Sequence, residues 1–567
     1  MTTTRSGFTK LAAVCIAILL GAVVWELGWP LTRAEHEWSR LIAAVATLGH
    51  LTGILGSYFR KEINRPSLRL LIFQIISCLM IFLLIAREQQ EAGYMRFTEL
   101  SRLVITAGLI AIPTLMSLTR IFEWLVGKQK KGRPLMAPAM QFVASLGVVI
   151  LAGTGLLLLP NSTYPGITLS FTDALFTSTS AVCVTGLNAV DFAHTFTPLG
   201  EMFTLALIQI GGFGIMTFAY FVAMVAGQGF SLRDRVLLTD LLDEDNLGAV
   251  VSFITTIVVS TLFIELCGAV LLYFSWEGKD INLMGEPLWW HSLFHSVSAF
   301  CNAGFSTFPM NLMEPGIRLC YSGQAVIMAL IVCGGLGFGI YKEINSRLAN
   351  RFFSKHRRLH MQWTPYFKLV MISTGILLAG GALAIFAVSS PHAAEPLGEH
   401  LWICLFDSVT ARTAGFNISD YSRYLPAASL IMCGLMMVGG SPGGTAGGMR
   451  TTTCAIAGAE ILRILRGRDH VEFFRRRIDQ RTVARCVITV VVSCAWIGCF
   501  TVLICALEPS MSSLDIFFEN CSAFATVGVS RGITPDLSDP SKYLLIVNML
   551  AGRVGLFAFL IALAGTP

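Results

Sequence analysis

Long apolar stretches alternate with short polar ones along this chain, and many apolar stretches have the length of a bilayer crossing, about 20 residues. Four of them come first, at about Leu11–Leu27, Leu41–Phe59, Leu68–Ala86 and Leu103–Val126. The first stretch is followed closely by further apolar spans and has no small-residue cleavage site. We therefore expect a retained anchor rather than a removed signal peptide. This part of the pattern predicts four N-terminal transmembrane helices.

The pattern then becomes repetitive. An apolar helix, an amphipathic stretch too short to cross, a loop with a glycine, and a second apolar helix occur four times. First helices are expected near Phe142–Leu159, Val250–Phe274, Phe367–Val388 and Val483–Leu507. Second helices are expected near Met202–Val225, Ala325–Tyr341, Leu430–Ile464 and Leu544–Leu563. The short stretches between them are Phe171–Thr179, Trp289–Val297, Leu401–Val409 and Ser513–Cys521, and we expect them to be re-entrant.

We therefore expect an all-α integral membrane protein. Four pseudo-symmetric helix–pore loop–helix repeats surround one central pore, and four extra transmembrane helices precede them. The expected divisions are 1-134 for the N-terminal extension and 135-240, 241-360, 361-480 and 481-567 for repeats 1 to 4.

Composition and charge agree with a membrane protein. Hydrophobic residues make up 54% of the 567 residues and charged residues 13%, about half the charge usual in a soluble domain. The net charge of +6 comes from basic clusters between apolar spans, which form no aromatic-interleaved patch, so nucleic acid is not an expected partner. Alternate loops are rich in lysine and arginine, which favours twelve spans with both termini cytoplasmic.

The 15 cysteines form no CxxC pair, and buried free thiols are expected.

Each of the four loops has a hydroxyl residue, an alanine, a few small residues and a glycine: Ser180–Gly186, Ser298–Gly304, Thr410–Gly415, which is one residue shorter, and Ser522–Gly528. Four such loops around one axis could replace the hydration shell of a cation with backbone carbonyls. The alternative is that the glycines only permit close helix packing; four matching contexts favour the pore. The proposed carbonyl ligands belong to Cys183, Val184, Thr185, Gly186, Cys301, Asn302, Ala303, Gly304, Arg412, Thr413, Ala414, Gly415, Ala525, Thr526, Val527 and Gly528.

A second glycine motif follows in each repeat, at Gly211–Gly214, Gly334–Gly337, Gly439–Pro442 and Gly552–Gly555. In the third repeat it expands into a segment that breaks a helix and would form a gate below the filter, the alternative being a simple kink. Arg553 would join this gate, either by repelling cations or by donating hydrogen bonds to the loop's carbonyls. Arg412 should point away from the filter, paired with Asp407 or another carboxylate. The gate residues are Gly439, Gly440, Ser441, Pro442, Gly443, Gly444, Thr445, Ala446, Gly447, Gly448 and Arg553.

These motifs resemble the Trk/Ktr/HKT superfamily of potassium transporters, and most closely the membrane subunit of bacterial Ktr and Trk systems. The resemblance rests on Val184–Leu187, Asn302–Phe305, Arg412–Asn417, Thr526–Ser530, Gly439–Thr453 and Gly552–Arg553, and it covers about Met140 to the C-terminus. It implies a filter glycine in each repeat, an intramembrane gating loop and the Arg553 barrier. A glycine in the first loop, where sodium-type plant relatives often have serine, favours potassium.

The resemblance also implies assembly. Relatives form homodimers with one pore in each protomer, and a cytosolic ring of nucleotide-binding subunits controls the gate. The nucleotide is therefore expected on the partner, and this chain should hold no cofactor besides the transported potassium. Docking surfaces are expected around Arg233–Asn246, Arg347–Arg358 and Arg463–Arg481. The sequence ends at Pro567, soon after the last expected helix, so the tail that helps some relatives dimerise is not expected.

The main prediction is potassium uptake across the bacterial inner membrane through a gated channel-like pore. A sodium-permeable or cation-coupled symporter, using sodium or protons, stays open on the same scaffold. An integral-membrane enzyme is disfavoured because the residues it would need, Glu265, Asp240, Asp243 and His291, are scattered across repeats. A scaffold with a dead pore is the remaining alternative.

Overall fold

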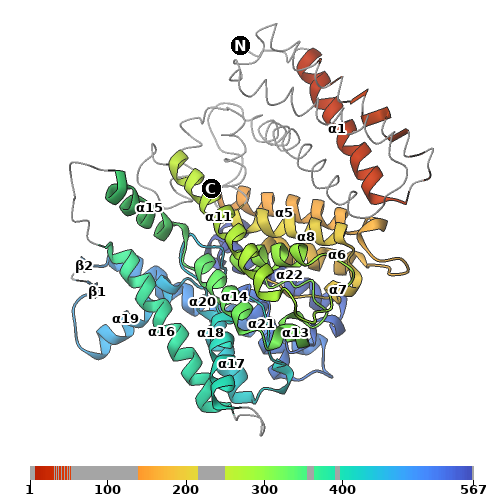
Figure 1. Ribbon diagram of the computed structural model, residues 1–567. Coiled ribbons are helices and arrows are strands. Elements are labelled where there is room, and N and C mark those ends of the chain that lie inside the picture. The colour runs from red at the N-terminus through yellow and green to blue at the C-terminus, as the bar shows by residue number, and fades with distance from the viewer. Residues whose placement is uncertain are drawn as a thin grey trace. The chain divides into compact units, whose positions relative to one another are not determined.

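The computed structural model describes residues 7–30, scattered positions between 32 and 52, and residues 138–214, 250–353, 363–389, 396–474 and 476–564. The chain divides into two compact units. The first comprises Met1–Leu135, Leu159–Asn161 and Met216–Ile254, and the second comprises Met136–Leu158, Ser162–Ile215 and Thr255–Pro567. Helices dominate both units in the described part (Figure 1).

In the first unit, helix α1 (Gly7–Gly28) covers the first expected span. Ala22 in α1 packs with Ala43 and Ala46, and the Ser39 hydroxyl donates to Glu26 at 2.9 Å. The second expected span is described only at scattered positions, and the third and fourth lie outside the described residues, as does the expected docking loop Arg233–Asn246.

Four successive segments are each made of a long helix, a short helix and another helix, and they belong to the second unit except for the start of α11 up to Ile254. Segment 1 has α5 (Pro138–Leu157), α6 (Phe171–Cys183) and α8 (Pro198–Phe213). Segment 2 has α11 (Val250–Trp276), α12 (Leu288–Cys301) and α14 (Tyr321–Gly335). Segment 3 has α16 (Pro365–Val388), α17 (Leu397–Thr410) and α18 (Pro426–Met437). Segment 4 has α20 (Gln480–Leu507), α21 (Ser513–Ala525) and α22 (Asp539–Val554).

The remaining described elements are connections and continuations. They are α7 (Phe192–Thr195), α13 (Pro315–Arg318), α15 (Phe338–Phe353), α19 (Thr451–Leu465), α23 (Leu556–Ala564), the single turns Pro160–Ser162, Asn311–Met313, Tyr421–Arg423 and Thr534–Asp536, and an antiparallel hairpin of β1 (Glu472–Phe473) and β2 (Arg476–Arg477). The hairpin and the end of α19 fall within the expected docking surface Arg463–Arg481. The surface Arg347–Arg358 begins at the end of α15.

Local sequence explains where several helices begin. Ser170, Thr197 and Thr364 lie just before α6, α8 and α16, and each side-chain oxygen accepts a hydrogen bond from a backbone N–H of the first turn. Such caps satisfy donors that have no partner inside the helix. In α8 and α16 a proline follows in the first turn, where its missing N–H costs nothing.

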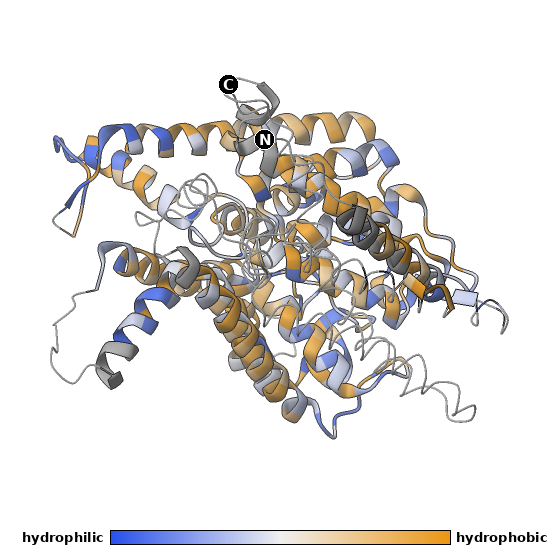
Figure 2. Ribbon diagram, turned by 90° about the horizontal axis from the view of Figure 1, so that it is seen from above, coloured by the Kyte–Doolittle hydropathy of each residue, from blue (hydrophilic) through white to orange (hydrophobic). Residues whose placement is uncertain are grey.

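The long first helices carry the membrane-like surface. Ile254–Trp276, Pro365–Val388 and Gln480–Leu507 are long and apolar enough to cross a bilayer, and they expose large side chains such as Phe263, Phe274 and Val502. Within the described residues these three pass the length test, and a fourth crossing results if α14 and the start of α15 count as one bent span. Hydrophobic residues predominate along the helices, whereas hydrophilic ones gather at several helix ends and loops (Figure 2).

The second helices end before the expected ranges do. Each one ends at its glycine motif: α8 at Gly214, α14 at Leu336–Gly337, α18 at Val438, and α22 at Gly555. Gly214, Gly337 and Gly555 have φ of 76°, 89° and 92°, a region that side chains disfavour. Between α14 and α15 the chain turns by 93°. Gly214, Gly337 and Gly555 leave the helical region and end α8, α14 and α22, whereas α18 ends before the glycine-rich segment that was expected to break a helix.

Cysteine burial also differs in part. All described cysteines are free, as expected, but Cys267, Cys494 and Cys499 are exposed. They lie on α11 and α20, whose outer faces are apolar and uncovered in the described part.

Candidate functional site

The four short helices end in the same way. The residue after α6, α12 and α21 adopts a left-handed conformation, and so does Thr413 after α17; the four residues are Val184, Asn302, Thr413 and Thr526. Two residues later comes a glycine with positive φ: 93° at Gly186, 69° at Gly304, 81° at Gly415 and 95° at Gly528. Non-glycine residues rarely adopt the left-handed conformation, so its recurrence at one offset shows that the four loops share a backbone path.

The shorter third loop reaches this path by a tighter turn. Thr185, Ala303 and Val527 donate their N–H to the carbonyl oxygen five residues earlier, at 2.7–2.9 Å. Ala414 donates to Thr410, four residues earlier, at 2.9 Å. This four-residue hydrogen bond, an α-turn, compensates for the residue that the third loop lacks.

The loop glycines, Gly186, Gly304, Gly415 and Gly528, form a closed ring. A Cβ on Gly186 would lie 2.3 Å from the carbonyl oxygen of Ala303. The corresponding distance is 2.7 Å from Gly304 to Ala414 and 2.7 Å from Gly415 to Val527. From Gly528 it is 2.1 Å to Thr185, in the first loop. Each glycine therefore lies against the next loop in chain order, and only glycine fits at this separation.

Hydroxyl groups hold the loops at the ends of the short helices. The Oγ atoms of Ser180 and Ser522 accept the N–H of Gly186 and Gly528 at 3.0 Å. In the other two loops the hydroxyl group acts as donor, from Ser298 to the carbonyl of Phe305 at 2.8 Å and from Thr410 to that of Phe416 at 2.6 Å. These hydroxyl residues lie six residues before the loop glycine, or five in the shorter third loop, and their hydrogen bonds were not predicted from the sequence.

Several buried polar groups at the ring have no hydrogen-bond partner in the described part, including the Thr185 and Thr526 hydroxyls and a set of carbonyl oxygens. Thr185, Ala303, Ala414 and Val527 are fully buried. Among the described residues, no donor is assigned to their carbonyl oxygens. Buried carbonyls are normally paired, so this ring has the capacity to bind a cation or water. The short helices also direct their negative ends toward it.

Each short helix is anchored in the first helix of its own segment. Ser178, Ser296 and Ser408 donate to carbonyl oxygens of Ile150, Glu265 and Leu378 at 2.6–2.9 Å. A glycine three residues after each acceptor makes room, since a Cβ at Gly153, Gly268 or Gly381 would lie 2.4–2.5 Å from the serine Oγ. In segment 4, Asn520 donates to Ile497 at 2.8 Å. These serines and Asn520 were not identified from the sequence, although each lies two residues before the hydroxyl residue that begins its loop.

The segment Val438–Arg450, which we call the crossing loop, lies against segments 2 and 4 of the site. Ser441 and Thr445 donate their N–H to Gly335 and Gly334 of α14 at 3.0 and 3.3 Å. The Thr445 hydroxyl donates to the carbonyl of Phe300 in α12 at 3.3 Å. A Cβ on Gly447 would lie 2.1 Å from the Thr526 hydroxyl of the fourth loop. The loop therefore contacts segments 2 and 4 directly beside the ends of their short helices.

Arg553 joins the crossing loop to segment 1. Its guanidinium donates to the carbonyl oxygens of Thr445 and Gly211. Of the two roles that the sequence suggested, hydrogen bonding to the glycine-rich loop is therefore made in the structure. The same group places a positive charge beside the loop.

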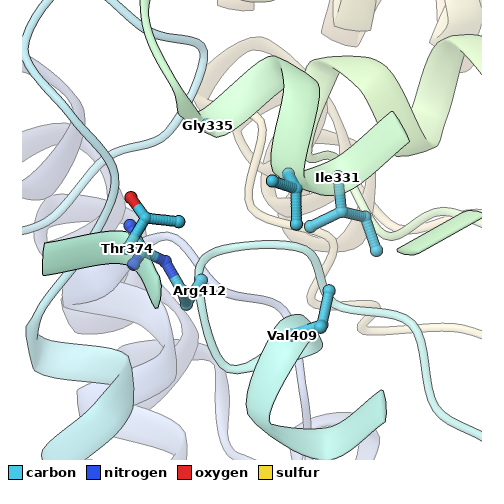
Figure 3. Close-up of a pocket in the computed structure, with 6 residues that line it drawn as sticks. Ile331, Gly335, Thr374, Val409 and Arg412 are labelled. Carbon is cyan, nitrogen blue, oxygen red and sulfur yellow. The ribbon is translucent and has the colours of Figure 1, made fainter. Parts of the chain in front are cut away.

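Arg412 does not have the partner that was expected. Asp407 accepts from Tyr421 at 2.9 Å, from Ser419 at 3.4 Å and from Tyr424. Arg412 instead donates to the carbonyl of Gly439 at 3.3 Å. Its guanidinium lies in a small pocket with Thr374 and Val409, below Ile331 and Gly335 (Figure 3). The pairing with Asp407 was wrong, because three hydroxyl groups already satisfy that carboxylate.

Residues considered for an enzyme do not converge. Glu265 accepts from Gln209 at 3.1 Å, whereas His291 contacts Thr307 and the carbonyl of Leu283. Asp240 and Asp243 lie outside the described residues. In the described part, no group of three or more His, Cys, Asp or Glu residues is placed to hold a metal ion.

Comparison with known proteins places this geometry in a family. A family model described as TrkH, cation transport protein, matches residues 104–566. The Ktr system potassium uptake protein B of Bacillus subtilis is 34% identical over 433 residues, which are 74% of this chain and 91% of that protein. The potassium/sodium uptake protein NtpJ of Enterococcus hirae is 33% identical over 446 residues, 77% of this chain and 94% of that protein.

A solved structure has the same fold. The potassium transporter TrkH from Vibrio parahaemolyticus matches with a TM-score of 0.61 at 18% identity, over 88% of this chain and 97% of that one. The match of the family model over most of the chain, together with these relatives, shows that this membrane protein belongs to the TrkH family of cation transport proteins.

Proposed function

We propose that this protein takes up potassium across the plasma membrane through a gated, channel-like pore. The closed ring of four loop glycines, with buried carbonyl oxygens at each contact, is the observation that carries the proposal. A cation gives up its hydration shell only where other oxygens replace it, and rings of backbone carbonyls do this. The relatives described as potassium uptake proteins support the same ion.

In this proposal the four segments are pseudo-symmetric repeats, with divisions at 135-240, 241-360, 361-480 and 481-567, and four further helices precede them. The short helices are pore helices. The carbonyls of Cys183–Gly186, Cys301–Gly304, Arg412–Gly415 and Ala525–Gly528 form the filter. Cyclic packing of α8 on α12, α14 on α17, α18 on α21 and α22 on α6 supports one shared axis.

Potassium is the preferred ion in this proposal, and a sodium-permeable or cation-coupled pathway is the second candidate. A relative described as a potassium/sodium uptake protein keeps the second candidate in view. Glycine occupies all four equivalent positions here, which by family resemblance favours potassium.

The crossing loop and Arg553 form the gate in this proposal. The loop lies beside the inner ends of two short helices, and Arg553 fastens it to α8. An arginine at membrane depth is costly, and a positive charge on the inner side opposes cation passage. Movement of the loop together with Arg553 would open the pathway.

The proposed assembly is a homodimer with a cytosolic, nucleotide-binding regulatory ring and cytoplasmic termini. The basic hairpin of β1 and β2 and the end of α15 are the described candidates for docking that ring. No nucleotide is proposed on this chain.

Expression in bacterial cells that lack potassium uptake tests the proposal. Wild-type protein should restore growth at low potassium and take up rubidium, and excess sodium should compete weakly. The filter variant Gly186→Asp should abolish uptake at unchanged membrane abundance. Equal sodium and rubidium flux would contradict potassium selectivity, and absent flux with normal expression would contradict transport by this chain alone.

A further inference from the structure

The second helix of every segment carries a polar side chain at its fourth residue. These residues are Glu201 in α8, Gln324 in α14, Ser429 in α18 and Lys542 in α22. Their exposed fractions are 5%, 1%, 0% and 6%. A buried polar side chain costs free energy unless it is hydrogen-bonded, so a polar group at one position in four helices requires an explanation.

Each of these side chains bonds to the next segment in the ring. Glu201 accepts from the Trp290 indole at 2.6 Å, and Gln324 accepts from the Trp402 indole at 2.6 Å. Trp290 and Trp402 lie on α12 and α17, the short helices of segments 2 and 3. Two junctions are thus made by the same pair of groups, a side-chain oxygen and an indole N–H.

The other two junctions use charged partners. Ser429 accepts from Arg531 at 2.7 Å, and Arg531 is ion-paired with Asp515 of α21 at 2.5 Å. Lys542 donates to Asp173 of α6 at 2.8 Å, with exposed side-chain fractions of 8% and 19%. This last bond joins segment 4 to segment 1, so the four junctions close a circle in the same order as the glycine ring.

Asp173, Trp290 and Asp515 lie in the first turn of their short helices, at the end opposite the glycines, whereas Trp402 is the sixth residue of α17 and Arg531 follows Gly528. Asp173 is the third residue of α6, whose other end leads into Gly186, and Trp290 is the third residue of α12, which leads into Gly304. A short α-helix is a stiff rod with a rise of about 1.5 Å per residue. Displacement at one end therefore moves the loop at the other.

We propose that these four bonds, which we call the junction belt, set the spacing of the glycine ring and thereby the preference of the pore for potassium over sodium. This inference rests on the proposed function. The members of the belt are positioning residues, which never contact the ion. The chemistry varies among the four junctions while the position is constant, which fits a shared mechanical role.

The ion pair between Lys542 and Asp173 offers the sharpest test, because the two residues can be exchanged. Sodium inhibition of rubidium uptake is measured for Lys542→Met, for Asp173→Asn and for the swapped pair Asp173→Lys with Lys542→Asp. Each single variant should increase sodium inhibition several-fold, and the swapped pair should recover at least half of the lost selectivity. Lys542→Arg should behave like the wild type.

The uncharged junction between Gln324 and Trp402 shows whether selectivity depends on the position of the short helix or on charge near the pore. Gln324→Leu removes the acceptor of Trp402 without altering charge, and it should also increase sodium inhibition. The control is Arg423→Met, which breaks an exposed ion pair with Asp420 inside one segment, at 3.2 Å with exposed fractions of 76% and 46%. Hydrogen bonding from Ser422 lowers the pKa of Asp420, so this control pair is charged at neutral pH. Its loss should leave selectivity unchanged.

The melting temperature of purified protein in detergent shows whether the bond exists. Lys542→Met and Asp173→Asn should be non-additive in a double-mutant cycle. The belt proposal fails if these variants show coupling but retain wild-type selectivity, or if they show no coupling. Wild-type protein that fails to distinguish rubidium from sodium would instead overturn the proposed function, so the two failures are distinguishable.

Discussion

Gly528 lies against the carbonyl group of Thr185, so the last of the four loops contacts the first. A Cβ on Gly528 would lie 2.1 Å from that oxygen, closer than any real contact between these atoms. Among the four junctions of the ring this approach is the tightest. Of the four loops, these two are the farthest apart in sequence, which makes their contact the strictest test of the pore.

Gly528→Ala should abolish selective rubidium uptake, because the methyl group would push the first and fourth loops apart. The matched control is Gly532→Ala. Gly528 and Gly532 have nearly equal φ, 95° and 91°, but a Cβ on Gly532 meets nothing within 4 Å. Both variants bear about the same backbone cost, ~1–2 kcal/mol. Equal loss of selectivity in the two variants would show that backbone strain, not the ring contact, is responsible.

Arg553→Ala should raise ion flux in the absence of any regulatory partner, by about tenfold or more. The change removes two hydrogen bonds from a charged donor, each worth ~1.5–3 kcal/mol, and it removes the positive charge. Arg553→Lys separates these effects, because lysine keeps the charge but loses the planar fork of donors. Uptake per molecule in vesicles is the measurement. Wild-type flux in Arg553→Ala at normal abundance would contradict the gate.

Tyr366→Phe should loosen the crossing loop. The Tyr366 hydroxyl donates to the carbonyl of Pro442 at 2.9 Å, and a net loss of ~0.5–1.5 kcal/mol corresponds to about a two- to tenfold increase in flux. Tyr341→Phe is the control, since its hydroxyl donates to Cys333 of α14, outside the loop, at 2.7 Å. If the two variants conduct alike, the loop bond does not hold the gate.

Gly381→Ala should lower the melting temperature of the purified protein, whereas Gly380→Ala should not. A Cβ on Gly381 would lie 2.4 Å from the Ser408 Oγ and 2.9 Å from Leu435, and such overpacking costs ~1–3 kcal/mol. A Cβ on Gly380 meets nothing within 4 Å, and alanine is the better helix former. Adding Ser408→Ala to Gly381→Ala should restore part of the loss; strict additivity of the two changes would disprove the contact.

Local chemistry allowed the sequence to determine much of this protein. The alternation of apolar spans, the four short amphipathic stretches and the four loop glycines can all be read from residue type and spacing, because bilayer thickness fixes span length and backbone conformation selects glycine. The same reasoning identified Arg553 and the expanded motif at Gly439–Gly448. These features depend on neighbours within a few residues.

Only the tertiary structure decided which groups meet across segments. It placed Gly528 against Thr185, directed Arg412 to Gly439 instead of Asp407, ended each second helix at its glycine motif, and paired Lys542 with Asp173. Such partners come from distant segments whose order around an axis is set by packing. A sequence specifies which groups need partners, but the packed chain selects those partners, because a buried polar group bonds to whatever donor or acceptor packing brings within about 3 Å.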